Sequence, residues 1–580
     1  MTPREVQRRH LLFEKFHSLM KMISNLKVRS AIIFLLFAAA SSQLLGQPAN
    51  LDRERVYDVK NYVIRLSFDR SRKLVFGDTT VELTPLGAAL TSVKLDAVDL
   101  DFSSIRFEGA SKDLRHSTEA GQVNVDLDRS YKPGETIAIR FKYTIRDPKK
   151  GIYFIPVSAP SERFKHPAQI WSQNEPEDAR YWFPSFDFPS DKATSEEFIT
   201  VLKGELAVGN GRQLETKANP NGTQTFHFRM EVPHSTYLTS FVVGDFAKLM
   251  DKHNEVPLGF YAYKDRERVA GMAFSRTKDM MSNFESLTGI PFPFAKYDQI
   301  MVSGFQEFDG MENVTATTLA DNNILFAEYP FGRPLVEDLI SHELAHSWFG
   351  DMVTCRNWSE LWLNEGFATF MEAVTREKFY GRGNYVEKLL EDRDTFIVDD
   401  AISKNRHALR NMTAKGDNSL FDATTYQKGG LVLHMLRETI GDGNFWKGVN
   451  LYLARHKYDN ATSVDLQSSM EEATGQNLQW FFDQWVFAAG YPKLEIHQAY
   501  DGTKHQLAVT IDQVQKEDGI TPAAFRFPLE VFLTTPAGPV TQTLNVTKRS
   551  ETFTIDIGSE PSKFEIDKNE KVALKTVKMV

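Results

Sequence analysis

Two histidines and a glutamate are spaced along the chain so that they can bind one metal ion. In the segment His342-Glu343-Leu344-Ala345-His346, a helical turn of about 100° per residue places the two imidazoles about 40° apart on one face. Glu365 follows after eighteen intervening residues and supplies a carboxylate as the third ligand. Two nitrogens and one carboxylate leave a fourth position for water, which is typical of catalytic rather than structural zinc. The spacing therefore predicts one zinc ion held by His342, His346 and Glu365.

Glu343 lies beside this site without being one of the predicted ligands. On the same helix it is about 60° further round than His346, close enough to contact a water molecule at the metal. Zinc can lower the pKa of such a water to around 7 and can polarise a carbonyl group. We therefore expect Glu343 to act as a general base and then to pass the proton to a leaving amine. The chemistry that these residue types indicate is amide hydrolysis.

Two helices must position these residues. Pro334 suits the first turn of a helix that continues through LVEDLISHELAHSWF to Gly350. A second helix is predicted through ELWLNEGFATFMEAVTREKF, which contains the glutamate ligand. On the first helix, Leu335 and Leu339 share the face of the two histidines, which predicts that this face packs in the core.

The hydrophobic pattern divides the chain into an α+β multidomain arrangement. Residues 51–248 alternate with period two, as in Ile137, Ile139 and Phe141, which predicts an N-terminal antiparallel β domain. The period becomes helical over residues 249–490, the predicted catalytic domain, which is mainly α. Alternation returns over residues 491–580, which predicts a C-terminal β-sandwich.

Composition limits the class of protein. The chain has 580 residues and a net charge of −9, with 42% hydrophobic and 25% charged residues, which is typical of globular proteins and not of a chain disordered throughout. A pI of about 5.9 gives no reason to expect nucleic-acid binding. Cys355 is the single cysteine, so no intrachain disulfide can form, and we expect it to be a small buried apolar residue.

The first 47 residues have the order of charge and hydropathy found in an export signal. Residues 1–30 contain seven basic and two acidic residues, and the uncharged stretch AIIFLLFAAASSQLLGQPAN follows. Its apolar part is short for a membrane span of about 20 residues. We expect a signal peptide or an N-terminal anchor over residues 1–47. The protein is then periplasmic or secreted, and it contacts a membrane only if this segment is retained.

Four motifs in this chain resemble those of the M1 family of zinc aminopeptidases, gluzincins that include aminopeptidase N and leukotriene A4 hydrolase. The motifs are the zinc block HELAHSWFGDMVT…WLNEGFATFME, the exopeptidase motif Gly310-Met311-Glu312-Asn313, the tyrosine block beginning at Tyr426, and the N-domain block QNEPEDAR beginning at Gln173. The resemblance covers nearly all of the chain after residue 50. It implies a thermolysin-like catalytic domain and peptide substrates with a free N-terminus.

The resemblance also implies roles for residues outside the zinc block. Glu175 and Glu312 match the positions that hold the substrate ammonium group, and Tyr426 matches the residue whose hydroxyl stabilises the tetrahedral oxyanion. Gly310, Met311 and Asn313 belong to the motif that shapes the pocket for the first substrate residue.

The sequence departs from the family pattern in two ways. Asp309 stands where the family usually has a glycine, which puts the local backbone geometry in question and adds a negative charge nearby. Many relatives continue into a helical domain that caps the cavity, whereas this sequence ends soon after the predicted β-sandwich. We expect wider access and longer peptide substrates, or closure by another subunit. The sequence leaves the oligomeric state open.

Two alternative functions remain at this stage. A thermolysin-like endopeptidase shares the HExxH segment and the downstream glutamate, but such enzymes typically have Asp where this chain has Thr369. A non-catalytic zinc-binding scaffold is the other alternative, and the presence of Glu343 and Tyr426 disfavours it. Acetylation of the peptide N-terminus separates an endopeptidase from an aminopeptidase, because only the aminopeptidase needs a free amine.

Overall fold

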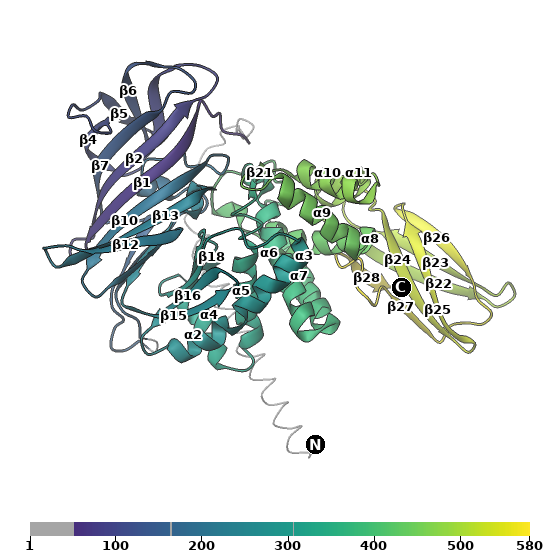
Figure 1. Cartoon of the computed structure of the whole chain (residues 1–580). Coiled ribbons are helices and arrows are strands. Elements are labelled where there is room, and N and C mark those ends of the chain that lie inside the picture. Colours follow the sequence, from purple (N-terminus) through teal and green to yellow (C-terminus); the bar gives the residue numbers. More distant parts are fainter. Residues whose placement is uncertain (1–50, 163–164, 306) are drawn as a thin grey trace. The chain divides into compact units, whose positions relative to one another are not determined.

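The structure is a computed structural model that describes residues 51–162, 165–305 and 307–580 (Figure 1). The predicted export signal over residues 1–47 lies outside these ranges. Among the helices of the described part, none is long and apolar enough to cross a membrane.

A seven-stranded sheet dominates the first part of the described chain. Along β7 (Ile137–Arg146) every second side chain is buried, as the alternation predicts. The pairing is antiparallel between β1 and β2 and between most other neighbours, as predicted, but β1 and β10 pair parallel, so the prediction of an antiparallel domain is wrong for this one pair. A parallel pair needs a long crossover, and the segment between these two strands contains β2, β4 and β7 of the same sheet. The order is β12-β13-β10-β1-β2-β7-β4, with β1 Tyr57–Asp69, β2 Leu74–Pro85, β4 Asp101–Phe107, β10 Lys192–Leu202, β12 Arg212–Ala218 and β13 Thr223–Ser235.

Two smaller sheets accompany it. The sheet β3-β6-β5 contains Leu90–Asp96, Gln122–Tyr131 and His116–Glu119, and the sheet β11-β14-β9-β8 contains Leu206–Gly209, Phe241–Gly244, Gln169–Gln173 and Gly151–Ile155. Every residue of β9 is buried, and the chain that leaves this strand reaches Glu175 two residues later. A fully buried strand therefore fixes the start of the segment that carries this glutamate.

A five-stranded sheet opens the middle part of the chain, in the order β15-β16-β17-β19-β18. The short strand β18 (Gly310–Met311) is at its edge and pairs with β19 (Ala316–Ala320), which places the predicted exopeptidase motif on a sheet edge. The remaining strands are β15 Phe246–His253, β16 Val256–Tyr263 and β17 Tyr297–Val302.

Helices form most of the chain between residues 321 and 485. The helix α6 is buried over nearly its whole length. Its Gly366 allows close contact with Gly429 at the start of α8, because a Cβ on Gly366 would lie 2.9 Å from the Gly429 Cα. The helices are α2 Glu267–Ala273, α3 Thr277–Thr288, α4 Asp321–Leu325, α5 Arg333–Ala345, α6 Trp362–Tyr380, α7 Arg382–Ile402, α8 Gly429–Ile440, α9 Asp442–Arg455, α10 Ser463–Thr474 and α11 Gln479–Trp485.

The last part of the chain is rich in strands, as predicted. It contains a four-stranded sheet β26-β23-β22-β28 and a three-stranded sheet β25-β24-β27. The β-sandwich, the thermolysin-like description and the boundaries at residues 248 and 490 stay predictions. The bounds are β22 Lys493–Asp501, β23 Gln506–Gln513, β24 Phe527–Thr535, β25 Gly538–Val546, β26 Ser550–Asp556, β27 Lys563–Ile566 and β28 Thr576–Met579.

Candidate active site

The two predicted histidine ligands lie at the C-terminal end of α5. The helix begins beside Pro334, as predicted, but it ends at Ala345 instead of continuing to Gly350. His346 is the capping residue, and the chain then turns with the Phe349 backbone N–H donating to the Ala345 carbonyl at 3.1 Å. The turn keeps His346 on the same side as His342, with their ring centroids 4.8 Å apart.

The three predicted ligands converge in a geometry that fits a tetrahedral ion. The Nε2 atoms of His342 and His346 lie 3.2 and 3.4 Å from one carboxylate oxygen of Glu365. Ligands about 2.1 Å from a tetrahedral zinc ion are about 3.4 Å from one another, because the tetrahedron edge is about 1.6 times the bond. The residues present therefore fit the metal that the sequence predicts, with His342, His346 and Glu365 as its holders.

The other ring nitrogen of each histidine is also occupied. His346 Nδ1 lies 3.0 Å from the Phe349 carbonyl oxygen, and His342 Nδ1 lies 2.8 Å from a carboxylate oxygen of Glu372. Because the carbonyl can only accept, His346 must carry a proton on Nδ1, so Nε2 is the nitrogen whose lone pair can bind a metal ion when the ring is neutral. Such outer contacts orient metal-binding histidines.

Glu372 is itself held by a buried cation. The second oxygen of its carboxylate lies 2.9 Å from Lys388 Nζ, and Lys388 is also 2.6 Å from Asp392 on the next turn of α7. Burial raises the pKa of Glu372, but the charge of Lys388 and the hydrogen bond to His342 outweigh burial and lower it to about 2. Glu372 is thus an ionised acceptor for the His342 ring.

Sequence reasoning missed Glu372 and Lys388. One signal was available, since Glu372 follows Glu365 by seven residues, which places both on nearly the same face of α6, two turns apart. Lys388 lies on a different helix, and only the packing of α7 against α6 reveals its contact.

Glu343, the predicted general base, is buried beside Gly310 of the sheet edge. A Cβ on Gly310 would lie 2.0 Å from a Glu343 carboxylate oxygen, so a side chain at position 310 is incompatible with this placement. The other oxygen of Glu343 is buried and has no hydrogen-bond partner in the described ranges. Burial raises the pKa of Glu343 to about 8, which suits a group that takes and returns a proton near neutral pH.

Glu175 and Glu312 form a buried acidic pair next to the ligand Glu365. One carboxylate oxygen from each of the three residues lies within 4.8 Å of the other two. In both Glu175 and Glu312, one buried oxygen has no hydrogen-bond partner among the described residues. Burial and the neighbouring carboxylates raise the pKa of Glu175, and burial raises that of Glu312. A bound cation would stabilise both ionised groups.

Met311 and Asn313 hold the loop that carries Glu312. The Met311 sulfur accepts a hydrogen bond from Gln173 Nε2 at 3.3 Å, and Asn313 Nδ2 donates to Thr318 Oγ1 at 3.1 Å. Gln173 joins this loop to the end of β9, a contact that sequence reasoning did not assign although Gln173 opens the N-domain block.

Asp309, the departure from the family pattern, adopts a backbone conformation that glycine would accept. Its φ is 59°, in the left-handed region that Asp tolerates better than most side chains. The carboxylate accepts a hydrogen bond from Asn323 Nδ2 at 2.9 Å. The substitution therefore preserves the turn before Gly310.

Tyr426 lies over the first histidine ligand. It belongs to a short π-helical turn, Thr424–Lys428, directly before α8. Its ring is nearly parallel to that of His342, with an interplanar angle of 9° and centroids 5.9 Å apart. Burial, followed by the charges of Glu365 and Glu175, raises the pKa of the hydroxyl, which therefore remains a hydrogen-bond donor.

The prediction that the histidine-bearing face of α5 packs in the core is wrong at its N-terminal end. Leu335 is 55% exposed, and Leu339 is only half-buried. Cys355, in contrast, is buried and free, as predicted.

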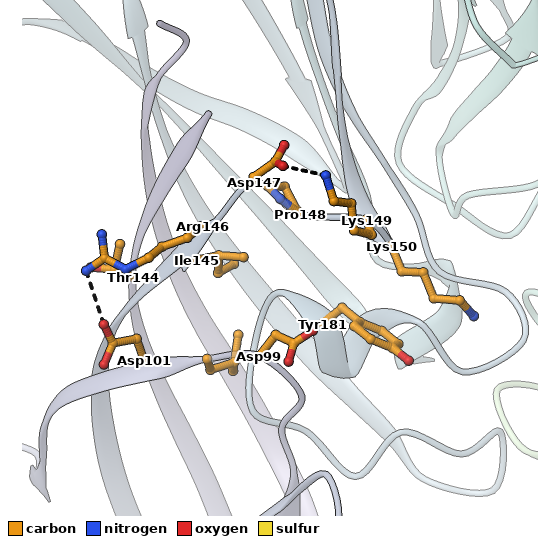
Figure 2. A pocket seen from close by; sticks show the side chains of 11 residues that line it. Asp99, Asp101, Thr144, Ile145, Arg146, Asp147, Pro148, Lys149, Lys150 and Tyr181 are labelled. Carbon is orange, nitrogen blue, oxygen red and sulfur yellow. Dashed lines mark hydrogen bonds and ion pairs between the residues drawn. The ribbon is translucent and has the colours of Figure 1, made fainter. Parts of the chain in front are cut away.

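A separate cavity of about 560 Å³ lies in the N-terminal β region (Figure 2). Its basic side chains already have acidic partners, with Arg146 3.2 Å from Asp101, and Lys149 bonded to Asp147. None of the residues predicted for the metal or the substrate lines it. The candidate active site therefore lies at α5 and α6 and not at this cavity.

Two imidazoles and a carboxylate at tetrahedral spacing, with a buried glutamate beside them, define the class of metal-dependent hydrolases. Comparison with known proteins agrees with this class. The peptidase family M1 domain matches residues 272–485, and the peptidase M1 N-terminal domain matches residues 58–238. The chain belongs to peptidase family M1.

Several curated aminopeptidases are similar to this chain. Aminopeptidase 2 of Candida albicans is 27% identical over 73% of this chain and 47% of its own length. Mitochondrial aminopeptidase 2 of Saccharomyces cerevisiae is 27% identical over 91% of this chain and 56% of its own length. Glutamyl aminopeptidase of Bos taurus is 32% identical over 56% of this chain and 34% of its own length. The chain thus spans about half the length, or less, of these relatives.

Proposed function

We propose that this protein is a zinc-dependent aminopeptidase that removes the N-terminal residue of peptides. The observation that carries the proposal is the pair of buried, unpartnered carboxylate oxygens of Glu175 and Glu312 beside the three metal-binding residues. Two such carboxylates are unfavourable unless a cation neutralises them. The N-terminal ammonium group of a peptide supplies that cation, because its pKa is about 7.7–8.0.

The position of the acidic pair explains why cleavage is limited to the first residue. Glu312 is 4.0 Å from the His346 ring, so an ammonium group bound to it lies within one residue of the metal-binding atoms. Only the first peptide bond then reaches the site. Met311 and Asn313 keep the Glu312 loop in place, and Gly310 leaves the room that Glu343 needs.

The chain's own residues carry the proton transfers. A zinc ion held by His342, His346 and Glu365 would polarise the scissile carbonyl and acidify water. Glu343 takes the proton from the attacking water and returns it to the leaving amine. Tyr426 donates its hydroxyl hydrogen to the oxyanion that develops on the carbonyl.

A panel of aminoacyl reporter substrates tests the activity. We expect turnover by the wild type and a severe loss in Glu343→Gln, which keeps the shape of the side chain but cannot accept the proton. Equal rates for both proteins would refute the mechanism. We also expect Glu312→Ala to impair cleavage of free-amine peptides. If N-acetylated peptides were cleaved as fast as free ones, an endopeptidase would replace the aminopeptidase.

We also propose that the catalytic region is thermolysin-like, that the last strands form a β-sandwich, and that the protein is exported. Export is supported by the basic and then apolar order of residues 1–47. N-terminal sequencing of the protein recovered from outside the cytoplasm checks it, and recovery in the cytoplasm alone would contradict it.

A further inference from the structure

An exposed apolar surface adjoins the start of the helix that carries the histidine ligands. It consists of Phe326, Tyr329, Phe331 and Leu335, all of them substantially exposed, and we name it the aromatic patch. The Tyr329 and Phe331 rings are stacked with centroids 5.5 Å apart, and both rings also contact Phe326. Phe331 is 62% exposed. Contiguous apolar groups left in solvent commonly mark a binding surface.

The patch is aligned with the candidate active site. Leu335 precedes His342 by seven residues, so on α5 it lies about 20° from His342 around the axis and about 10 Å along it. Leu339 lies between the two residues on the same side and is half-buried. One face of α5 therefore leads from the metal-binding residues to the aromatic patch.

The acidic pair sets the direction in which a peptide crosses this face. Glu312 lies near His346, at the C-terminal end of α5. With the ammonium group held there and the scissile carbonyl at the histidines, the rest of the peptide continues toward the N-terminal end of the helix. An extended peptide advances about 3.3 Å per residue, so about three residues span the distance from His342 to Leu335.

From this alignment we propose that the aromatic patch binds an apolar side chain at the fourth or fifth residue of the peptide substrate. The inference rests on the proposed aminopeptidase function and specifies its substrate class. The preferred substrates are peptides of five or more residues with an aromatic or aliphatic side chain at that place. Burial of one such side chain on the patch strengthens binding about tenfold.

Two hexapeptides test this inference, both with alanine first and with serine at the other positions, except that one has phenylalanine at positions four and five. The wild type should show a KM about tenfold lower for the phenylalanine peptide, with a similar kcat. The double variant Tyr329→Ser/Phe331→Ser should lose this preference. The matched control Ile402→Ser removes an exposed apolar side chain from the end of α7 and should keep it.

A short aminoacyl reporter separates this inference from the proposed function. The reporter does not extend to the patch, so its cleavage should be the same in the double variant as in the wild type. Failure of the wild type to cleave the reporter would refute the aminopeptidase itself. Cleavage of the reporter with equal KM values for the two hexapeptides would refute only the patch. Light scattering adds an independent outcome, since a wild-type dimer that the double variant dissociates would make the patch a self-association surface and overturn the inference.

Discussion

The contact from Glu372 to the His342 ring predicts a specific weakening of metal binding in Glu372→Gln. The glutamine removes the negative charge, and because its amide has one oxygen and one NH2 group it can keep only one of two acceptor contacts. In the wild type these contacts join Glu372 to His342 Nδ1 at 2.8 Å and to Lys388 Nζ at 2.9 Å. Lys388 retains Asp392 at 2.6 Å as a partner, so the variant does not leave a buried cation unpaired. The substitution therefore changes the electron donation of one ligand with little change in packing.

The expected magnitude follows from the place of Glu372 next to a ligand. Loss of a hydrogen-bonded carboxylate behind a metal-binding histidine typically lowers metal affinity 10- to 100-fold, which is about 1.4–2.7 kcal/mol. Equilibrium competition with a chromophoric chelator measures the zinc dissociation constant without any assay of activity. Thermal melting of the metal-free protein shows whether the fold itself has changed.

Glu377→Gln provides a matched control on the same helix. Glu377 pairs with Arg382 and Arg437 and is not among the partners of His342, so this variant should bind zinc as the wild type does. If Glu372→Gln kept a zinc dissociation constant within about twofold of the wild type, the carboxylate would be a stability feature of α6 and the reasoning would be wrong. An equal loss in both variants would also contradict it.

Three other predictions follow from single contacts. Tyr426→Phe should lower kcat about 100-fold or more with little change in KM, because the hydroxyl acts on charge that develops during reaction, and steady-state kinetics would contradict this by showing mainly a KM effect. Gly310→Ala should greatly lower kcat while the protein remains folded, because the new Cβ would displace the Glu343 carboxylate, and wild-type kinetics would show that the loop yields instead. His434 is buried and its pKa is lowered to about 4 by burial, so the unfolded chain binds the additional proton between pH 6.5 and 4. The free energy of unfolding should therefore decrease as the pH is lowered from about 6.5 to 4, by about 3 kcal/mol from this residue. His434→Gln should reduce this loss, which thermal melts at a series of pH values would measure.

The convergence of the candidate metal ligands could largely be predicted, because the spacing of residues along one helix is a local property of the sequence. The spacing of His342 and His346 is a property of any helix, and Pro334 marks where that helix begins. The strand alternation around Phe141 was equally local, and its buried pattern is confirmed. Hydrophobic periodicity and helix-start residues predict such helices and strands without knowledge of the segments that pack against them.

Features that depend on packing between distant segments could not be predicted from periodicity. Glu175 lies two residues after the buried strand β9, and Glu312 directly follows the edge strand β18. Nothing in the sequence near either residue predicts that they meet, so only the family resemblance placed them in one site. The parallel pairing of β1 with β10 and the contact of Lys388 with Glu372 are of the same kind. Leu335 was misassigned because helical periodicity shows which residues share a face but not whether another element covers it.

The buried carboxylates show why this arrangement indicates binding rather than stability. Burial raises the pKa of Glu175, Glu312 and Glu343, and each has a carboxylate oxygen without a hydrogen-bond partner in the described part of the chain. Packing them beside Glu365 opposes folding, so the extensive apolar core around α6 must offset the cost. Glu372 differs, because Lys388 already neutralises it. In the described part of the chain, the other three acids have no lysine or arginine partner and lie beside the predicted metal ligands, so their charge is available to an ion and to the ammonium group of a substrate.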